Sequence, residues 1–334
     1  MSRNADLDRL RGAAILLVLG HHYFASLFNS GWVGVDLFFV LSGFLLGGGL
    51  IDRRGSENYF GTFYARRVAR IIPLYALLIF TFAAGTWAVG MSQNLWMYAT
   101  FTQNIYWGLT GAAAPTWVSV TWSLAVEEQF YLALPLIVFL TPSRYLWRVL
   151  ASLILAAPLI RTFLLLIVGV RSGAAYQLMP CRMDSLFLGV LVAWSIRQPD
   201  LIQMVRRNRP TLFTIIAVGA LGIVPLVIEG WDNTTPIINL IGYSWIGVFF
   251  ALIVLAVVAW PSGIKAGPVA WIGERSYSIY LFHMPVALVV GHEIPAVGVT
   301  LALCWVLYRY IEQPILSFAH SRFGYSQRQQ IAVA

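Results

Sequence analysis

The sequence predicts an all-α fold, a polytopic bundle of about ten transmembrane helices. Hydrophobic residues make up 59% of the 334 residues and charged residues only 11%, whereas soluble domains carry about 25% charged residues. The apolar residues come in repeated runs close to the roughly 20 residues that a membrane-spanning helix needs. The arginines gather between these runs, as they do in the cytoplasmic loops of membrane proteins.

The apolar runs follow one another along the chain. The predicted spans are 11–29, 32–51, 71–91, 123–140, 149–168, 183–197, 211–228, 237–260, 271–290 and 296–312. The first run continues into further spans and has no cleavage site, so we expect a retained helix and not a signal peptide. Residues 93–122 are aromatic and interrupted by Gly and Pro, which favours an interfacial or re-entrant stretch. We expect one domain over residues 1–334, without an additional soluble domain.

The positions of the basic residues predict the orientation. With ten spans, most of the bases fall on one side, and the opposite side keeps few, chiefly Arg171. The bases on the first side are Arg3, Arg9, Arg11, Arg53, Arg54, Arg66, Arg67, Arg70, Arg144, Arg148, Arg206, Arg207, Arg209, Lys265, Arg322 and Arg328. The positive-inside rule therefore places both termini in the cytoplasm, and we expect a multi-pass protein of a bacterial inner membrane.

Several classes of protein are excluded or disfavoured. The formal net charge is +8, but there is no basic stripe with interleaved aromatic residues, so nucleic acid is not an expected partner. Cys181 and Cys304 lie in different segments without the spacing of metal ligands, so no metal site is expected. There is no Gly-x-Ser-x-Gly elbow, His-Glu-x-x-His motif or Walker loop, so an exposed serine nucleophile and a metal mechanism are poorly supported.

An ionisable residue inside a span is costly and marks a functional candidate. His22 lies midway along the first predicted span, and Arg11 opens the same helix from the cytoplasmic side. Eleven residues separate them, which is about 16 Å and about three helical turns, so the two share a face. We interpret His22 as catalytic and Arg11 as a ligand for an anion. A histidine bonded to a backbone carbonyl is the structural alternative, and we expect it for His21.

Two further arginines precede Pro73. Arg67 and Arg70 are spaced i,i+3 and share a helix face. Because the planar guanidinium matches phosphate oxygens, we interpret this pair as a phosphate-binding site. Positive-inside anchoring is the alternative, and it is accepted for Arg53 and Arg54.

Carboxylates lie in the outer half of the predicted bundle. Asp36, near the outer start of the second span, is a candidate for orienting His22, with capping or ion pairing as the alternative. Glu127 has Tyr131 as its i,i+4 partner, and the adjacent Glu128 faces another way. We therefore expect Glu127 to face a cavity and to take part in catalysis beside His22.

The remaining candidates are assigned to substrate binding: Trp122, Tyr131, Arg182, Asp184, Tyr280 and His283. For Arg182 and Asp184, a mutual ion pair or a pair with Glu127 is the structural alternative. Ser276, Tyr280 and His283 follow one helix face at i, i+4 and i+7, where polar contacts between helices are the alternative.

Seven blocks in order resemble the acyltransferase 3 family of bacterial membrane acyltransferases, over roughly residues 6 to 315. They are residues 7–12, His22, 34–44 (GVDLFFVLSGF), 63–73 (FYARRVARIIP), 122–131 (WSLAVEEQFY), 182–186 (RMDSL) and 276–285 (SYSIYLFHMP). The family's Arg–His motif corresponds to Arg11 and His22, and its Arg-x-x-Arg motif to Arg67 and Arg70.

The resemblance implies an O-acyltransferase that moves an acyl group, usually acetyl, from cytoplasmic acetyl-CoA to a hydroxyl of an extracytoplasmic or lipid-linked saccharide. The expected partners are acyl-CoA, the saccharide and membrane lipid, and the expected acceptor is an exopolysaccharide or lipopolysaccharide repeat unit. Some relatives of the family carry an extra esterase-like domain, for which this sequence has no counterpart.

Two mechanisms remain open at this point. His22 acts as a general base on the acceptor hydroxyl, or it takes the acyl group transiently and passes it on. A transporter or flippase of a lipid-linked glycan is the rival function, because buried charges also line transport pathways. Against it, the sequence has none of the inverted repeats common in transporters. A scaffold for polysaccharide synthesis would leave the buried His and carboxylates unexplained.

Overall fold

The computed structural model describes residues 4–91, 94–170, 172–232, 235–264 and 266–323. Within these ranges the regular structure is helical, with no β-strand, which confirms the predicted all-α class. Arg3, Arg171, Lys265 and Arg328, which contribute to the predicted orientation, lie outside the described residues.

A helix occupies each of the ten predicted spans. These helices are α1 (Ala5–Tyr23), α2 (Gly34–Asp52), α3 (Tyr59–Ala88), α6 (Thr121–Leu140), α7 (Leu146–Thr162), α9 (Met179–Ser195), α11 (Arg209–Leu221), α13 (Tyr243–Ala259), α15 (Ser276–Val290) and α16 (Glu293–Leu307). Among the described residues, eight helices are long and apolar enough to cross a membrane; α15 is a shorter apolar helix and α1 is not among the eight. The chain is therefore a multi-pass helical membrane protein, while the count of ten crossings and the cytoplasmic termini stay predictions.

Short elements connect and extend these helices. The stretch 93–122 contains α4 (Trp96–Ala99), α5 (Gln103–Thr110) and the turn η2 (Thr116–Val118). These pieces are too short to span a bilayer on their own, as expected for an interrupted stretch. The other short elements are η1 (Asn29–Val33), η3 (Ser143–Tyr145), η4 (Phe163–Val168), α8 (Ser172–Gln177), α10 (Pro199–Arg207), α12 (Val224–Ile228), η5 (Ile238–Gly242), α14 (Pro268–Glu274), η6 (Tyr308–Glu312) and α17 (Gln313–Arg322).

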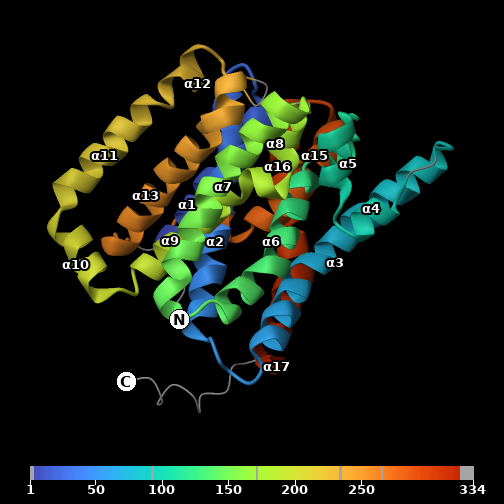
Figure 1. The fold of residues 1–334 in the computed structure, drawn as a ribbon. Coiled ribbons are helices and arrows are strands. Elements are labelled where there is room, and N and C mark those ends of the chain that lie inside the picture. Colours follow the sequence, from blue (N-terminus) through green and yellow to red (C-terminus); the bar gives the residue numbers. More distant parts are fainter. Residues whose placement is uncertain (1–3, 92–93, 171, 233–234, 265, 324–334) are drawn as a thin grey trace.

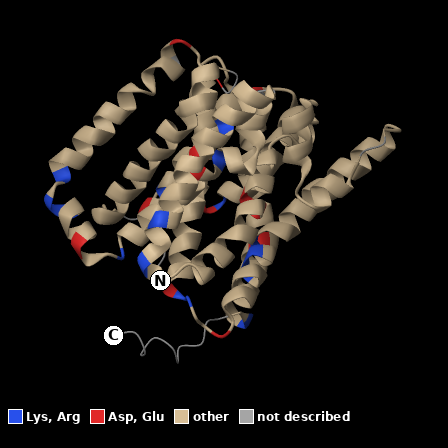
Figure 2. Cartoon of the chain, viewed as in Figure 1, with Lys and Arg blue, Asp and Glu red and all other residues tan. Residues whose placement is uncertain are grey.

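Most of the helices form one bundle, and two helical segments project from it. In Figure 1, α11 stands at one side of the bundle and the second half of α3 extends beyond the opposite side. The starts of α1 and α3 and the helix α17 lie at the same end of the bundle (Figure 1). Charged segments gather at that end, with a few inside the bundle, so the overall charge distribution is asymmetric (Figure 2).

The helices α2 and α9 cross in close contact because both carry glycine at the crossing. A Cβ atom on Gly43 would lie 1.9 Å from the carbonyl oxygen of Leu186, and one on Gly189 would lie 2.0 Å from that of Val40. Small residues allow transmembrane helices to approach to backbone contact. This crossing brings the start of α2, with Asp36, against the start of α9, with Arg182.

The first helix ends earlier than the sequence predicts. It runs from Ala5 to Tyr23, about 28 Å, whereas the predicted span is 11–29. The chain turns back after Phe24, and Gly31 packs so closely on α1 that a Cβ atom there would lie 2.2 Å from the carbonyl oxygen of Leu17. His22 is consequently in the last turn of its helix and exposed, not midway along a span.

Candidate active site

One cavity of about 190 Å³ lies between α1, α2, α3, α6 and α15. It brings together half of the site residues predicted from the sequence: Arg11, Arg67, Arg70, Glu127, Tyr131 and Tyr280. Ser276, which the sequence placed on the same helix face as Tyr280, also lines it, together with Ser42, Ser123 and Tyr277. The five helices thus converge on a space lined by apolar side chains and a small set of polar groups, as ligand sites in proteins are.

The three cavity arginines differ in their partners. Arg11 forms an ion pair with Asp8 one turn earlier in α1, at 2.8 Å. Arg70 forms an ion pair with the buried carboxylate of Glu312, which also accepts a hydrogen bond from Ser278 at 2.6 Å. By contrast, no acceptor for the guanidinium of Arg67 is found among the described residues.

This difference refines the predicted phosphate site. Arg67 presents to the cavity a guanidinium that no described residue engages in a hydrogen bond, although the carboxylates of Glu127 and Glu128 act on it electrostatically. Arg70 has to share its guanidinium with Glu312 and also stacks over the ring of Tyr277, with 5.4 Å between Cζ and the ring centroid. The sequence did not reveal Glu312, because it comes at the very end of the last predicted span.

Hydroxyl groups connect the carboxylate of Glu127 to its surroundings. Ser42 of α2 donates a hydrogen bond to Glu127, and Tyr131 donates to Ser42 at 3.5 Å. Tyr131 also interacts with Glu127 directly, as its i,i+4 spacing predicts, and the serine from another helix contacts both side chains. Nothing in the sequence distinguished Ser42 from the hydroxyl residues that commonly join membrane helices.

Tyr280 separates the cavity from a pair of histidines. Its hydroxyl shares a hydrogen bond with Ser123 at 2.6 Å and donates to the carbonyl of Val120 at 3.2 Å. Three residues further along α15, the buried His283 places its Nε2 atom 3.2 Å from Nδ1 of His22. The rings of Tyr280 and His283 have centroids 6.0 Å apart. His22 does not line the cavity itself. It is connected to the cavity residue Tyr280 only through His283.

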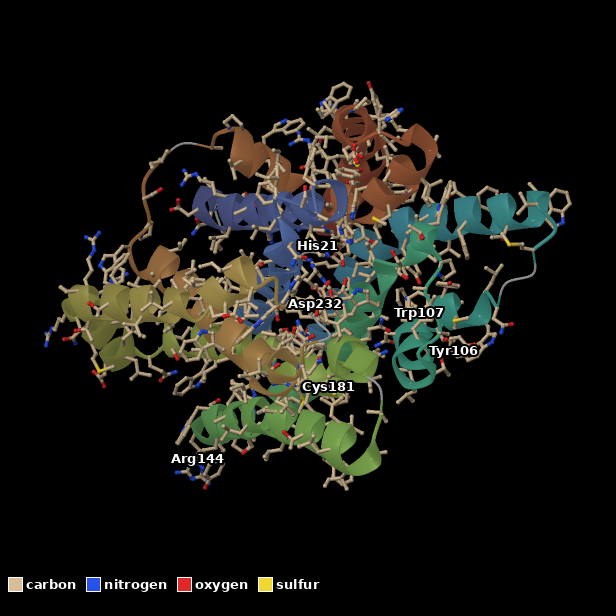
Figure 3. All side chains as sticks on the ribbon, turned by 90° about the horizontal axis from the view of Figure 1, so that it is seen from above. His21, Tyr106, Trp107, Arg144, Cys181 and Asp232 are labelled. Carbon is tan, nitrogen blue, oxygen red and sulfur yellow. The ribbon has the colours of Figure 1, made fainter. Side chains whose placement is uncertain are left out.

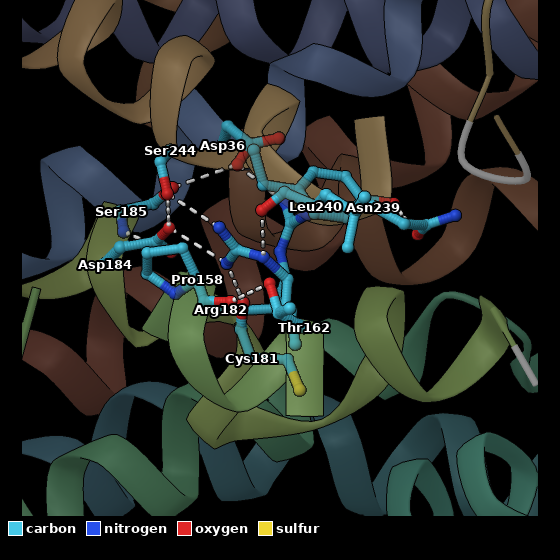
Figure 4. Close-up of polar contacts among 12 residues, drawn as sticks. Asp36, Pro158, Thr162, Cys181, Arg182, Asp184, Ser185, Asn239, Leu240 and Ser244 are labelled. Carbon is cyan, nitrogen blue, oxygen red and sulfur yellow. Dashed lines mark hydrogen bonds and ion pairs between the residues drawn. The ribbon is translucent and has the colours of Figure 1, made fainter. Parts of the chain in front are cut away.

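A second polar cluster lies buried at the start of α9, outside the cavity lining (Figure 4). Arg182 donates to Asp36 at 2.6 Å, and Ser185 donates to the same carboxylate at 3.0 Å. Asp36 is thus held by Arg182, and the expected contact between Asp36 and His22 does not form. The structural alternative for Arg182, an ion pair with Asp184 or Glu127, does not form either, because Arg182 pairs with Asp36. Residues two apart on a helix, such as Arg182 and Asp184, point in different directions.

Asp184 has its own cation, which the sequence analysis missed. Arg161 of α7 donates to Asp184 at 2.9 Å, and Ser244 donates to the same oxygen at 2.6 Å (Figure 4). Both side chains of this ion pair are fully buried. The signal for Arg161 was present, since it is an ionisable residue inside the predicted span 149–168.

The guanidinium of Arg182 lies 3.7 Å from the ring centroid of Tyr243, and its Nε and Nη1 atoms are buried without a hydrogen-bond partner. A cation over an aromatic face is stabilised by the ring's electrons. Trp122 packs nearby against Phe39 and Tyr176, with ring centroids 6.1 and 4.3 Å away. Arg182, Asp184, Trp122 and His283, all predicted to bind substrate, are therefore buried side chains that do not line the cavity.

A second cavity of about 350 Å³ is larger but holds none of the predicted site residues. Its lining residues lie at or near the ends of several helices, and they include Arg54, Arg144, Trp147 and Trp194. Arg54 is occupied by Ser143 and the carbonyl of Phe139, at 3.0 and 2.9 Å. Figure 3 places Arg144 at the periphery of the bundle and His21 nearer its centre. We therefore take the first cavity as the candidate active site.

Arginines, a carboxylate and hydroxyl groups from five helices thus line one cavity of a multi-pass helical membrane protein. Residues 4–315 match the family model described as an acyltransferase domain. The chain belongs to this family, the acyltransferase 3 family, as the sequence motifs indicated.

The curated relatives include membrane O-acetyltransferases. The chain is 27% identical to the O-acetyltransferase OatA of Staphylococcus aureus (strain NCTC 8325 / PS 47), covering 97% of this chain and 59% of the relative. It is 25% identical to the peptidoglycan O-acetyltransferase OatA of Listeria monocytogenes, over 93% of this chain and 55% of the relative. It is 29% identical to YrhL of Bacillus subtilis (strain 168), over 92% of this chain and 54% of the relative.

The chain thus spans little more than half the length of these curated relatives. No solved structure matches it.

Proposed function

We propose that the chain is a membrane O-acetyltransferase that moves an acetyl group from acetyl-CoA to a hydroxyl of a saccharide. The observation that carries this proposal is the first cavity, which joins Arg67, a guanidinium without a hydrogen-bonded acceptor among the described residues, to a tyrosine in contact with the His283–His22 pair. Family membership and the names of the relatives support O-acetyl transfer as the chemistry.

The arginine end of the cavity is suited to the phosphates of acetyl-CoA. Arg67 supplies a guanidinium with no competing acceptor among the described residues, and Arg11 and Arg70 add positive charge around the same space. Charge-assisted hydrogen bonds from guanidinium groups to phosphate are among the strongest in proteins. We infer that CoA enters from the cytoplasm of the bacterial cell through the inner-membrane face that carries the start of α1 and α3, since that face is the more basic one.

A second set of cavity groups is suited to handling hydroxyl groups. Ser42 forms a hydrogen bond with Glu127, and Ser123 forms one with Tyr280, so these two pairs join three helices. Beyond Tyr280, His22 is exposed at the end of α1, where an acceptor hydroxyl from the other side of the membrane would arrive. His22 would serve as a general base or as a transient carrier of the acyl group.

The acceptor is proposed as a class of molecule. The Listeria relative is named a peptidoglycan O-acetyltransferase. The resemblance of the sequence motifs implies exopolysaccharide or lipopolysaccharide repeat units, free or lipid-linked, as acceptors. All of them present secondary or primary hydroxyl groups on sugar rings, to which the same deprotonation and attack apply.

The test uses purified protein in detergent with radiolabelled acetyl-CoA. Saturable binding to wild type and to His22→Ala, with hydrolysis or transfer only in wild type, is the expected result. His21→Ala is the matched control, because His21 contacts the carbonyl of Asn29 at 2.8 Å and, unlike His22, has no hydrogen bond to His283. If wild type neither binds nor consumes any acyl-CoA, the proposal fails and transport of a glycan becomes the function to test.

The acceptor is identified in the same system. Purified peptidoglycan fragments, lipopolysaccharide and exopolysaccharide are each supplied with radiolabelled acetyl-CoA, and label that becomes bound to a saccharide is released by mild base if it is an O-acetyl ester. Label on none of them, despite acetyl-CoA turnover, would exclude these three acceptors.

A further inference from the structure

The contacts of His283 determine which of its nitrogens carries a hydrogen. Its Nδ1 atom lies 3.1 Å from the carbonyl oxygen of Ile279 and 2.9 Å from that of Tyr280. A carbonyl oxygen only accepts hydrogen bonds, so Nδ1 must be the donor. In a neutral imidazole the other nitrogen is then an acceptor. The Nε2 atom of His283 therefore presents a lone pair toward His22.

The same reasoning extends to His22. Its Nδ1 atom lies 3.0 Å from the carbonyl oxygen of Val18 and 3.2 Å from Nε2 of His283. Both neighbours are acceptors, so Nδ1 of His22 must carry the hydrogen. The Nε2 atom of a neutral His22 then holds the lone pair. Among the described residues, none forms a hydrogen bond with that atom.

The neutral pair is the arrangement that needs no buried counter-charge. His283 is fully buried, and no carboxylate in the described part of the chain forms an ion pair with either ring. The backbone of His283 is also held in place, because the hydroxyl of Tyr23 donates a hydrogen bond to the carbonyl oxygen of His283 at 2.8 Å. That hydroxyl is also 2.9 Å from Oγ1 of Thr300.

We propose that His283 is a positioning residue that fixes the tautomer of His22, so that Nε2 of His22 faces the reaction as the unprotonated nitrogen. This inference rests on the proposed acetyltransferase function. The orientation of a catalytic histidine is generally set by the hydrogen bond of its other nitrogen. Here a second histidine takes the place that a carboxylate has in many hydrolases.

The reaction balances with this assignment. The acceptor hydroxyl gives its proton to Nε2 of His22 while its oxygen forms a bond to the thioester carbon of acetyl-CoA. The bond from that carbon to sulfur then breaks, and the CoA thiolate takes the proton from Nε2 and leaves as the thiol. In the acyl-carrier variant, the same lone pair forms the bond to the acetyl carbon, the carbon–sulfur bond breaks and CoA departs as the thiolate. The oxygen of the acceptor hydroxyl then forms a bond to the acetyl carbon, the carbon–nitrogen bond breaks, and the hydroxyl proton passes to the thiolate.

Three variants separate positioning from a purely structural role. His283→Phe keeps a buried aromatic ring but removes the acceptor for Nδ1 of His22, and His283→Gln keeps an acceptor. His21→Phe is the control on the adjacent histidine. We expect turnover of acetyl-CoA to fall about 10- to 100-fold in His283→Phe, with the Kd for acetyl-CoA within about twofold of wild type. We expect His283→Gln to recover part of the rate and His21→Phe to keep all of it.

The tautomer is measured directly by NMR of protein labelled with ¹⁵N-histidine, with the His22 signals assigned by their loss in His22→Ala. We expect Nδ1 of His22 to be protonated and Nε2 unprotonated in wild type. In His283→Phe the fraction with the hydrogen on Nε2 is expected to rise. A hydrogen on Nε2 of His22 in wild type would overturn the inference, and so would a wild-type turnover rate in His283→Phe.

The two proposals fail in different ways. If wild type turns over acetyl-CoA, His22→Ala does not, and His283→Phe matches wild type, only the positioning role of His283 is lost. If wild type does not turn over any acyl-CoA, the acetyltransferase function is lost and the role of His283 in the reaction falls with it. In that case the NMR measurement still decides whether His283 sets the tautomer of His22.

Discussion

The carboxylate of Glu312 holds the guanidinium of Arg70 in an ion pair that joins the end of η6 to the first half of α3. Arg67, one turn earlier on the same face of α3, has no such partner in the described part of the chain. Two arginines that look equivalent in sequence therefore differ in what they can offer a ligand.

Arg67 is expected to contribute most directly to binding of acetyl-CoA. Replacing it by Gln removes a cation whose hydrogen bonds to a phosphate are worth about 1.5–3 kcal/mol, so the Kd for acetyl-CoA should rise about 10- to 100-fold. Binding of radiolabelled acetyl-CoA measures this change. Arg144→Gln, in the second cavity, is the control and should leave the Kd unchanged. Equal Kd values for Arg67→Gln and wild type would contradict the assignment of Arg67 to phosphate binding.

The ion pair between Arg70 and Glu312 predicts a thermodynamic coupling. Arg70→Gln leaves the buried carboxylate of Glu312 without its cation, and breaking a buried pair in this way costs about 3–5 kcal/mol. The double variant Arg70→Gln with Glu312→Gln should be more stable than Arg70→Gln alone. Unfolding by SDS in mixed micelles of wild type, Arg70→Gln, Glu312→Gln and the double variant gives the four free energies of unfolding for a double-mutant cycle. Additive effects of the two substitutions would show that the pair is not energetically coupled.

The buried pair of Arg161 with Asp184 is expected to support the fold and not the chemistry. Arg161→Gln should lower the free energy of unfolding by about 3–5 kcal/mol, because Asp184 is left as an uncompensated buried charge. Arg197→Gln provides the comparison: its pair with Asp52 is partly exposed, at 22% and 36%, so its loss should cost less than about 1 kcal/mol. A stable but inactive Arg161→Gln protein would instead point to a role in the reaction.

The crossing of α2 and α9 should not tolerate a side chain at Gly43. In Gly43→Ala the added Cβ would meet the carbonyl oxygen of Leu186 at 1.9 Å, so the helices must separate, which costs about 1–3 kcal/mol or more. Gly61→Ala in α3 is the matched control, because its Cβ would have no atom within 4 Å. There the change should stabilise the helix by up to about 1 kcal/mol. Melting temperatures of the two variants in detergent would test this difference, and a similar shift in both would contradict it.

Hydrophobic runs were sufficient to predict the helical bundle, since each run of the right length became a helix. The end of α1 was not predictable in this way, because residues 24–29 are nearly as apolar as the helix before them. The chain that turns back after the helix brings Gly31 against the backbone of Leu17, and no local pattern of hydrophobicity contains such a tertiary contact.

The sequence predicted several of the residues that line the candidate site, but it did not predict which residues pair with one another. Helical periodicity placed Ser276 and Tyr280 on one face, and both line the cavity. Pairing depends instead on which helices cross, so Asp36 was assigned to His22 although it pairs with Arg182. Ser42 escaped notice for a related reason: its contact with Glu127 joins two helices far apart in the sequence.

The short first helix has a mechanical consequence. Arg11 and His22 lie on the same helix. Arg11 lines the cavity and His22 contacts His283 of α15, so both positions require a fixed rotation and height of that helix. Inserting a single residue between them would turn His22 by about 100° and displace it by about 1.5 Å along the axis, away from His283. The spacing of eleven positions between Arg11 and His22 therefore sets where the imidazole lies relative to the cavity. An insertion or deletion between them should disturb the site as much as a substitution of either residue.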